Sequence, residues 1–327
     1  MEVQLIHSPA CRFCGKGPLH FQFTFSAPRE LTRNLDSDTF IISACGSCGT
    51  FQVNPHPSEA LARDFFSRAD LYLEAKDPEG RGVDYLERSE ARLEEYREYA
   101  RAITPFLPPK GGTILDLGAG SGLMLSLLPD KYRRVAVEPN AFLAQKAKDR
   151  GLAVVNDWAE NLKQPDPPLA LLLFNQSLDH FIRPDLILGR FLNWLEPGGL
   201  ILISGLINPL SLAARICGPN FRLWHPYHQI CPTRDAVIRK LASYGCEILS
   251  VYRPYFKTPF GSLPSLLKGA YVLSKAWLLK NRRAVPSPPW PGNVQSFLAR
   301  KKLLFSKVRA LDESELQSEK RLPTAAG

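Results

Sequence analysis

An acidic residue and three alternating glycines stand close together near the middle of the chain. The segment ILDLGAGSG (114–122) is an apolar run that meets an acid and then glycines at alternate positions: Asp116, Gly118, Gly120 and Gly122. The run is typical of a buried parallel strand, and the glycines are typical of a turn into a helix. Glycine tolerates positive φ and has no Cβ, so the backbone can approach a flat ligand. Because a helix N-terminus can bind a carboxylate, the segment predicts a nucleotide-type binding turn.

The glycine spacing separates two classes of ligand. Dinucleotide-binding folds carry G-x-G-x-x-G, whereas this chain has G-x-G-x-G with an acid two residues before the first glycine. In this it resembles the class I S-adenosylmethionine (SAM) methyltransferases, whose first motif has that form. SAM has no pyrophosphate, and the carboxylate of Asp116 suits its ammonium and sulfonium charges but would repel a phosphate. The expected ligand is SAM rather than NAD.

Further candidate SAM-binding residues follow at the ends of the next apolar runs. Glu138 ends RRVAVE, at about the spacing of the ribose-binding acid in dinucleotide folds, and a carboxylate can accept hydrogen bonds from two vicinal hydroxyls. Asp157 and Trp158 end the third run. In the resembling family the acid at this place accepts a hydrogen bond from the adenine amino group, and the indole would cover the adenine or pack in the core. Asn175, after the fourth run, completes the predicted set.

Apolar runs alternate with amphipathic helical segments over most of the chain. Strands are expected near residues 114–117, 133–138, 152–157, 169–175, 200–206, 246–254 and 293–301. This alternation predicts an α/β doubly wound sheet, and LEPGG before the fifth strand resembles the L-x-P-G-G turn of methyltransferases. The resemblance implies a Rossmann-like sheet of seven strands with the last one antiparallel. It covers about residues 83–254 and 290–302.

Four cysteines near the N-terminus form two matched pairs. They follow the pattern C-x2-C…C-x2-C: Cys11, Cys14, Cys45 and Cys48. Each pair can present two thiolates from one tight turn, and four thiolates in a tetrahedral array suit Zn²⁺. We expect a structural zinc site here rather than a redox pair, because no strand–helix context follows either pair. The other three cysteines, Cys217, Cys231 and Cys246, are expected to be ordinary reduced residues.

The second cysteine pair continues into CGSCGTFQVNPHPSEALARDFF, with Ser58 as the expected N-cap of a helix. A zinc knuckle of this form ahead of a SAM domain resembles the zinc-ribbon methyltransferases, several of which act on nucleotide sugars or related natural-product intermediates. The sugar C-methyltransferases of this type carry a further large C-terminal domain, and this chain is expected to lack it.

Charge is distributed unevenly along the 327 residues. The net charge is +9, and the segment from Tyr255 onward holds 13 Lys and Arg against 4 Asp and Glu, so the whole excess lies there. The expected organisation starts with a zinc ribbon (1–57) and a helical connector (58–110). A SAM-binding domain (111–254) follows and is completed by a late strand (292–302). A basic apolar insertion (255–291) precedes that strand, and a basic tail (303–327) follows it.

The insertion contains a helix candidate, SLPSLLKGAYVLSKAWLLKNRR. Its basic residues Lys268, Lys275 and Arg282 recur every seven positions, and apolar residues fill another face. Three interpretations are open: a cap over the substrate pocket, a helix lying in a membrane interface through residues 262–285, or a basic RNA-binding surface. The chain carries no RNA-recognition motif, no secretory signal and no run long enough to span a membrane.

Candidate bases for methyl transfer lie after the fourth and fifth strands. His180 follows the fourth strand next to Asp179, where the resembling family often has "E-H", and His225 and His228 lie in the loop after the fifth strand. Imidazole is a common base near neutral pH. We expect His225 or His228 to be the base, followed by His180; the alternative is that they only orient loops.

The sequence therefore predicts a cytoplasmic, class I SAM-dependent methyltransferase with a structural zinc ribbon. The expected acceptor is a small molecule, methylated on oxygen or carbon and related to a sugar or natural-product intermediate. Two alternatives remain: a non-catalytic SAM-binding or zinc-ribbon interaction protein, and an RNA methyltransferase.

Overall fold

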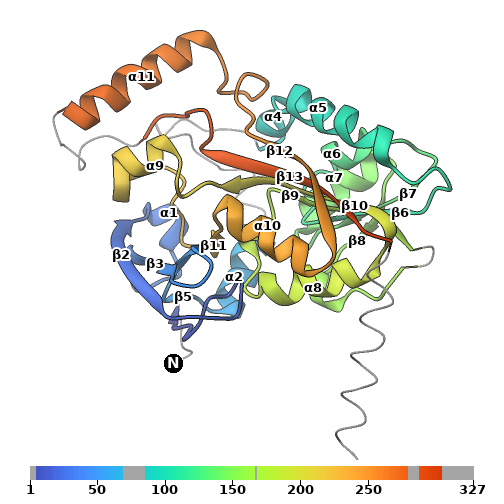
Figure 1. The fold of residues 1–327 in the computed structure, drawn as a ribbon, viewed down its shortest axis with the longest axis horizontal. Helices are drawn as coiled ribbons and strands as arrows, with labels where there is room; N and C mark the ends of the chain where they lie inside the picture. The colour runs from blue at the N-terminus through green and yellow to red at the C-terminus, as the bar shows by residue number, and fades with distance from the viewer. Residues whose placement is uncertain (1–4, 69–84, 166–167, 279–286, 304–327) are drawn as a thin grey trace, which may run out of the picture.

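The computed structural model describes residues 5–68, 85–165, 168–278 and 287–303. A seven-stranded sheet runs through its centre in the order β12-β13-β10-β9-β6-β7-β8 (Figure 1). Its strands are β6 (Thr113–Leu117), β7 (Arg133–Val137), β8 (Ala153–Val155), β9 (Leu169–Asn175), β10 (Leu195–Ile207), β12 (Cys246–Tyr252) and β13 (Val294–Lys301). β13 is antiparallel to both of its neighbours, and the pairs among β6 to β10 are parallel. The predicted Rossmann-like sheet with an antiparallel last strand is confirmed.

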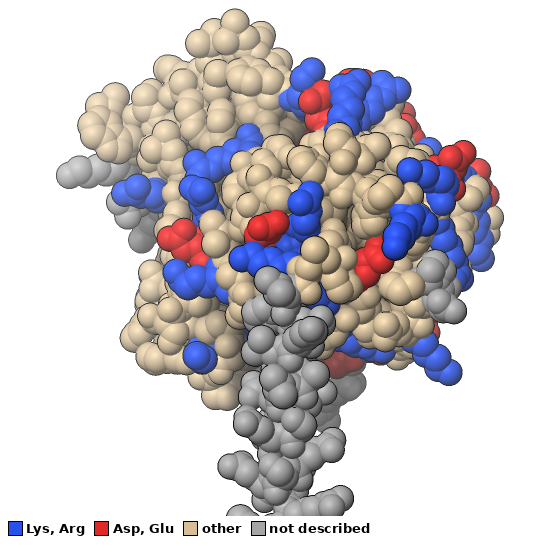
Figure 2. All heavy atoms as spheres, turned by 45° about the vertical axis from the view of Figure 1, so that its right-hand side comes forward, with Lys and Arg blue, Asp and Glu red and all other residues tan. Residues whose placement is uncertain are grey.

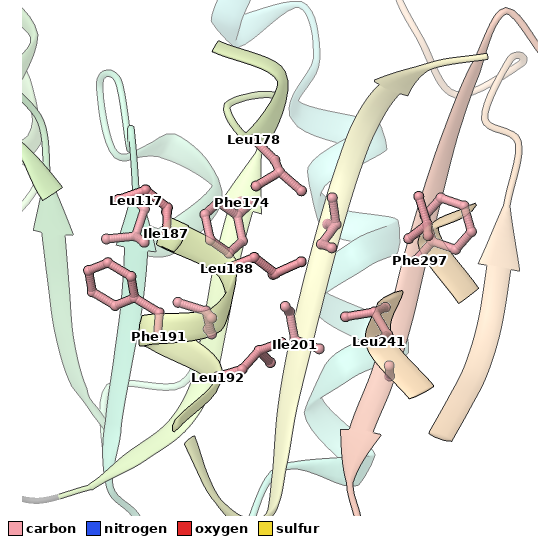
Figure 3. Close-up of a cluster of buried hydrophobic side chains, with 14 of the residues drawn as sticks. Leu117, Phe174, Leu178, Ile187, Leu188, Phe191, Leu192, Ile201, Leu241 and Phe297 are labelled. Carbon is pink, nitrogen blue, oxygen red and sulfur yellow. The ribbon is translucent and has the colours of Figure 1, made fainter. Parts of the chain in front are cut away.

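Helices cover both faces of this sheet because its central strands are buried on both sides. α8 (Pro184–Trp194) and α10 (Arg234–Ser243) pack on one face, where Phe191 of α8 lies in the same cluster as Phe174 of β9 (Figure 3). α5 (Leu93–Ile103), α6 (Leu123–Ser126) and α7 (Ala141–Asp149) pack on the other. Alternate residues of a strand point to opposite faces. The side chains of β6 and β9 therefore contribute to the hydrophobic cores on both faces of the sheet.

Hydrogen bonds and backbone angles define several helix ends, among them the predicted N-cap at Ser58. At the starts of α2 (Glu59–Ser67) and α10, the side-chain oxygens of Ser58 and Thr233 each accept a hydrogen bond from the backbone N–H three residues later. Gly151 and Gly245 adopt φ of 76° and 75° after α7 and α10, the left-handed conformation in which many helices end. The helical connector predicted over residues 58–110 contains α2, α4 (Tyr85–Glu90) and α5 in its described part.

The cysteine region forms a second, four-stranded sheet in the order β11-β4-β3-β2. β2 (Leu19–Ser26), β3 (Thr39–Cys45) and β4 (Phe51–Val53) come from the N-terminal segment, but β11 (Ile230–Cys231) comes from the loop after β10. Phe13, between the first two cysteines, is fully buried in the same core as α8. The N-terminal unit and the large sheet therefore share their packing.

The predicted insertion contains one described helix, α11 (Leu263–Leu278), which projects from the molecule and packs against α9 (Leu212–Cys217) (Figure 1). None of the described helices is long and apolar enough to cross a membrane. The tail from 304 onward lies outside the described residues. The same holds for seven of the thirteen basic residues counted above: Lys280, Arg282, Arg283, Lys307, Arg309, Lys320 and Arg321.

Candidate functional site

The predicted glycine turn connects β6 to α6 at the carboxyl edge of the sheet. Gly118, Gly120 and Gly122 adopt φ of 73°, 56° and 73°. A Cβ on Gly118 would lie 2.8 Å from the Cβ of Ser177, and one on Gly122 would lie 2.4 Å from Cδ1 of Leu152. Left-handed backbone and close neighbours both require glycine at these two positions. The turn thus exposes bare backbone where ligands bind in doubly wound sheets.

A cavity of about 250 Å³ opens beside this turn. The turn, the ends of β7 and β9, and side chains of α2 and α5 form its wall. Five of the predicted SAM-binding residues line it: Gly118, Gly120, Glu138, Trp158 and Asn175. The other three do not: Gly122 closes the turn against Leu152, Asp116 lies beneath it, and Asp157 faces its own loop, where Oδ1 accepts from the backbone N–H of Trp158.

Glu138 is held rigidly at the end of β7. Its Oε2 accepts from the backbone N–H of Gly120 at 2.8 Å, and its Oε1 accepts from that of Asn140 at 2.9 Å. The side chain is 5% exposed, and burial raises the pKa of its carboxyl group to about 7. Each carboxylate oxygen has a second lone pair, so the carboxylate can still accept hydrogen bonds from a ligand in the cavity that it lines.

Asp116 is a buried carboxylate without a hydrogen-bond partner on either oxygen among the described residues. Burial, and the charge of nearby Glu138, raise the pKa of Asp116 to about 7. A buried anion without a partner is costly, and a cationic ligand in the adjacent cavity would reduce that cost. The pair of acids below and beside the glycine turn therefore suits the positive charge of SAM.

Several residues that line the cavity are not among the predicted SAM-binding residues; they include three aromatic side chains, Phe66, Tyr96 and Phe181, and also Gln176, which follows Asn175 in the loop after the fourth strand. Gln176 has a positive φ of 56° and donates from Nε2 to the hydroxyl of Tyr96 at 3.2 Å. Non-glycine residues in this conformation often occur at functional sites. Phe66 and Tyr96 come from α2 and α5, so only folding brings them to the strand ends. The signal for Gln176 was its place directly after the fourth apolar run.

The three predicted histidines pack together, and one of them, His180, lies in the cavity wall. His180 lines the cavity and stacks between Phe66 and His228, with ring centroids 5.0 and 5.3 Å away, while His225 lies 4.7 Å from His228. Burial lowers the pKa of His180 to about 4, although Asp179 opposes the shift, and burial also lowers that of His225. Both rings are therefore neutral at pH 7.

Asp179 adds a carboxylate to this group, and the four residues Asp179, His180, His225 and His228 form a histidine cluster. Its Oδ1 is buried, makes no hydrogen bond within the described chain, and lies 4.0 Å from Nε2 of His180. Nδ1 of His228 lies 3.0 Å from the carbonyl oxygen of Leu223, which leaves Nε2 free to accept. Asp179 and His180 follow β9, whereas His225 and His228 lie in the loop after β10, so only folding brings the four side chains together.

The four predicted zinc ligands converge at the N-terminal unit. The Sγ atoms of Cys11 and Cys48 are 3.7 Å apart, as are those of Cys14 and Cys45, and all four thiols are free. Two sulfurs at about 2.3 Å from a tetrahedral zinc ion lie about 3.8 Å apart. Backbone N–H groups also point at the Sγ atoms of Cys11 and Cys45, as in a site that stabilises thiolates. The donor set fits zinc, which these residues would hold as a structural ion.

A buried arginine connects this unit to the histidine cluster. The guanidinium of Arg12 donates to Oε1 and to the carbonyl oxygen of Gln229 at 2.5 and 2.6 Å, and to the carbonyl oxygen of Val53 at 2.9 Å. The backbone N–H of Gln229 in turn donates to the carbonyl oxygen of Asp179 at 2.6 Å. The cysteine unit therefore supports the loop that carries the candidate bases.

α11 contributes none of the residues that line the cavity and packs instead against α9 and Trp290. The predicted cap over the pocket is therefore not observed in the described residues.

Comparisons with known proteins identify the larger unit. Residues 90–251 match a family model described as a methyltransferase domain. A search of curated proteins returned no match. Among solved structures, the magnesium protoporphyrin IX methyltransferase of Synechocystis PCC 6803 with bound SAH is similar over 75% of this chain and 100% of that chain, with 10% identity and a TM-score of 0.50. Likeness at this identity shows the fold.

Two further structures are similar at lower scores. A possible histamine N-methyltransferase from Thermotoga maritima is 20% identical over 67% of this chain and 94% of that chain, with a TM-score of 0.46. The plantazolicin methyltransferase BpumL in complex with SAH is 13% identical over 74% of this chain and 97% of that chain, with a TM-score of 0.44. The family match, together with the glycine turn, identifies residues 90–251 as a methyltransferase domain, and the first comparison shows that the chain has the fold of a SAM-dependent methyltransferase.

Proposed function

We propose that this enzyme methylates a hydroxyl oxygen or an acidic carbon of a small molecule, and that His180 is the base. The observation that carries the proposal is the position of His180, which lines the same cavity as Glu138 and the glycine turn. Of the three predicted histidines it is the one in the cavity wall, and its ring is neutral at pH 7 because burial lowers its pKa.

SAM supplies an electrophilic methyl group when it is bound. The residues of the chain then have to orient two molecules and remove one proton. Glu138, in the cavity wall, accepts hydrogen bonds from the hydroxyls of SAM, and the turn at Gly118 and Gly120 lets SAM approach the backbone. Asp116, buried beneath the turn, offsets the positive charge of SAM without touching it. Nε2 or Nδ1 of His180 takes the proton from the acceptor, and the carboxylate of Asp179 stabilises the resulting imidazolium.

The wall of the cavity indicates what kind of acceptor fits. Phe66, Tyr96 and Phe181 present apolar rings, while Gln176 and Asn175 present hydrogen-bonding groups next to them. Such a mixture of apolar walls and a few polar groups is typical of small-molecule sites. We therefore propose an acceptor with a planar or apolar body and one acidic O–H or C–H group.

The experiment is methyl transfer from labelled SAM to a panel of phenols, hydroxylated natural products and keto sugars, with the wild type and with His180→Ala. A base contributes about 10²- to 10⁴-fold, so we expect the variant to bind SAM normally and to lose at least about a hundredfold in transfer rate. His20→Ala, at an exposed position of β2, is the control and keeps full activity. Equal rates for wild type and His180→Ala would reject this base, and labelling of RNA but of no small molecule would reject the acceptor class.

A further inference from the structure

α11 presents an apolar stripe to solvent. Leu263, Leu267, Tyr271 and Leu278 are 60%, 63%, 66% and 68% exposed. Their spacing of four, four and seven residues places them on one side of the helix. Large apolar side chains are usually scattered on a protein surface rather than aligned, so the stripe calls for a physical explanation.

The opposite side of α11 is already used for packing. Gly269 and Leu273 are buried, and a Cβ on Gly269 would lie 3.2 Å from the ring of Trp290. α9 packs along the same side. The helix is therefore fixed to the protein by its inner side, and the orientation that exposes the stripe is built into the fold.

The charge around the stripe has one sign. From Ile248 to Leu311 the sequence contains no Asp or Glu and has twelve Lys and Arg. Lys268 and Lys275 are exposed. Lys268 follows Leu267 by one residue, or about 100° around the helix, so it lies on the flank of the stripe. An apolar stripe with basic flanks matches the boundary between the headgroups and acyl chains of an anionic bilayer.

The surroundings of α11 extend this surface. Phe256 and Phe260, just before the helix, are 62% and 41% exposed, and Leu210 and Leu212 near α9 are 53% and 51% exposed. The highest part of the surface in Figure 2, where α11 projects in Figure 1, shows almost no charged side chains. Between α9 and α11 lies an open apolar hollow of about 330 Å³, lined by residues such as Trp277 and Trp290, which offers room for the end of an acyl chain.

Topology places this surface at the same edge of the sheet as the cavity. β12 runs parallel to β10, and α11 follows its carboxyl end at Tyr252 and precedes β13 at Val294. The insertion therefore leaves the sheet from the edge at which the glycine turn lies.

We propose that α11 docks the enzyme on the surface of an anionic lipid bilayer, lying in the interface plane with its apolar stripe buried among the lipids. A second copy of the chain is a poorer occupant, because a two-fold contact through this face would bring the same lysines toward each other in a region without an acid. The proposal does not depend on the identity of the methyl acceptor.

The test is co-sedimentation of the full-length protein with vesicles of phosphatidylcholine alone and with 30% phosphatidylglycerol, at 0.1 M and 0.5 M NaCl. We expect binding to the anionic vesicles that weakens at high salt, and little binding to the neutral ones. Each basic residue near an anionic surface contributes about fivefold in binding. Lys268→Glu with Lys275→Glu should therefore weaken binding by at least about 25-fold, and Leu267→Gln with Tyr271→Gln should weaken it by about tenfold or more.

Matched controls separate docking from general charge and from misfolding. Lys148→Glu with Lys163→Glu removes two exposed lysines elsewhere, and Phe21→Gln removes a ring that is 64% exposed on β2; both should bind vesicles as the wild type does. SAM binding by every variant verifies the fold. The proposal is overturned if anionic vesicles do not bind the protein, if the controls lose binding as strongly as the α11 variants, or if light scattering shows a dimer that only the α11 variants dissociate.

Discussion

Replacing Glu138 by Gln tests the cofactor site most directly, because both oxygens of this side chain have known partners. They accept from the backbone N–H groups of Gly120 and Asn140 at 2.8 and 2.9 Å. An amide has only one oxygen, so its NH₂ group would face one of these N–H donors. The amide therefore has fewer acceptor positions left for SAM and no charge. A hydrogen bond from SAM to a charged group contributes about 1.5–3 kcal/mol, so the affinity for SAM should fall by about 10- to 150-fold at pH 8.

The free energy of unfolding should respond differently from the affinity. Burial raises the pKa of Glu138 to about 7, so in the folded protein without SAM the carboxylate is costly. Stability from this group is fully present below its unfolded pKa near 4.5 and is lost as the pH rises through about 7. The uncharged Gln side chain avoids the cost of a buried charge at high pH, but it also accepts one backbone hydrogen bond fewer, so the two effects on stability oppose each other. We therefore expect a small change in the stability of the SAM-free protein at pH 8 beside a large change in affinity.

The pH dependence of binding follows from the same shift. SAM, a cation, binds better when Glu138 is ionised, so the wild-type affinity should rise as the pH rises from 6 to 8, and Glu138→Gln should show a weaker rise. Asp116, whose pKa is also raised to about 7, keeps part of the dependence in the variant. Comparing the two proteins cancels the titration of SAM itself.

The assay is calorimetric titration with SAM at pH 6 and pH 8, with Glu160→Gln as the control because Glu160 is an exposed acid at a nearby position. The control should bind SAM as the wild type does. An affinity of Glu138→Gln within threefold of the wild type at pH 8, or the same pH dependence in both proteins, would refute the assignment of Glu138 to the SAM site.

Two further predictions concern the metal site and the glycine turn. Cys11→Ser with Cys45→Ser should reduce bound zinc from about one ion per chain to none and lower stability by more than about 4 kcal/mol; metal analysis and thermal unfolding measure both, and unchanged zinc content would rule out the ribbon site. Gly122→Ala should destabilise by about 2–4 kcal/mol in urea unfolding, because its φ is 73° and the new Cβ would lie 2.4 Å from Leu152. Gly151→Ala has a φ of 76° but no atom within 4 Å, so it should cost only the backbone part, about 1–2 kcal/mol; equal costs for the two variants would show that crowding at Gly122 is not important.

The sequence by itself determined the large sheet and the chemistry of its first turn. Both depend on local signals: apolar runs long enough for buried strands, and glycines where the backbone must turn left-handed beside a neighbour. Glu138 could be predicted because a residue at the end of a parallel strand reaches the ligand edge whatever surrounds the sheet. The cysteine pairs were equally local, since each tight turn by itself presents two thiolates.

Only the tertiary structure decided what surrounds that edge. Phe66 and Tyr96 reach the cavity from helices ahead of the sheet, and β11 joins the cysteine unit to the loop after β10 through contacts that no local pattern encodes. The three candidate bases are distinguished for the same reason: His180 lines the cavity, whereas His228 stacks on His180 and His225 packs against His228. α11 was recognisable as an amphipathic helix, but which of its sides is free depends on what packs against it. Long-range packing therefore determines which aromatic side chains line the cavity, because those residues come from segments far apart in the chain.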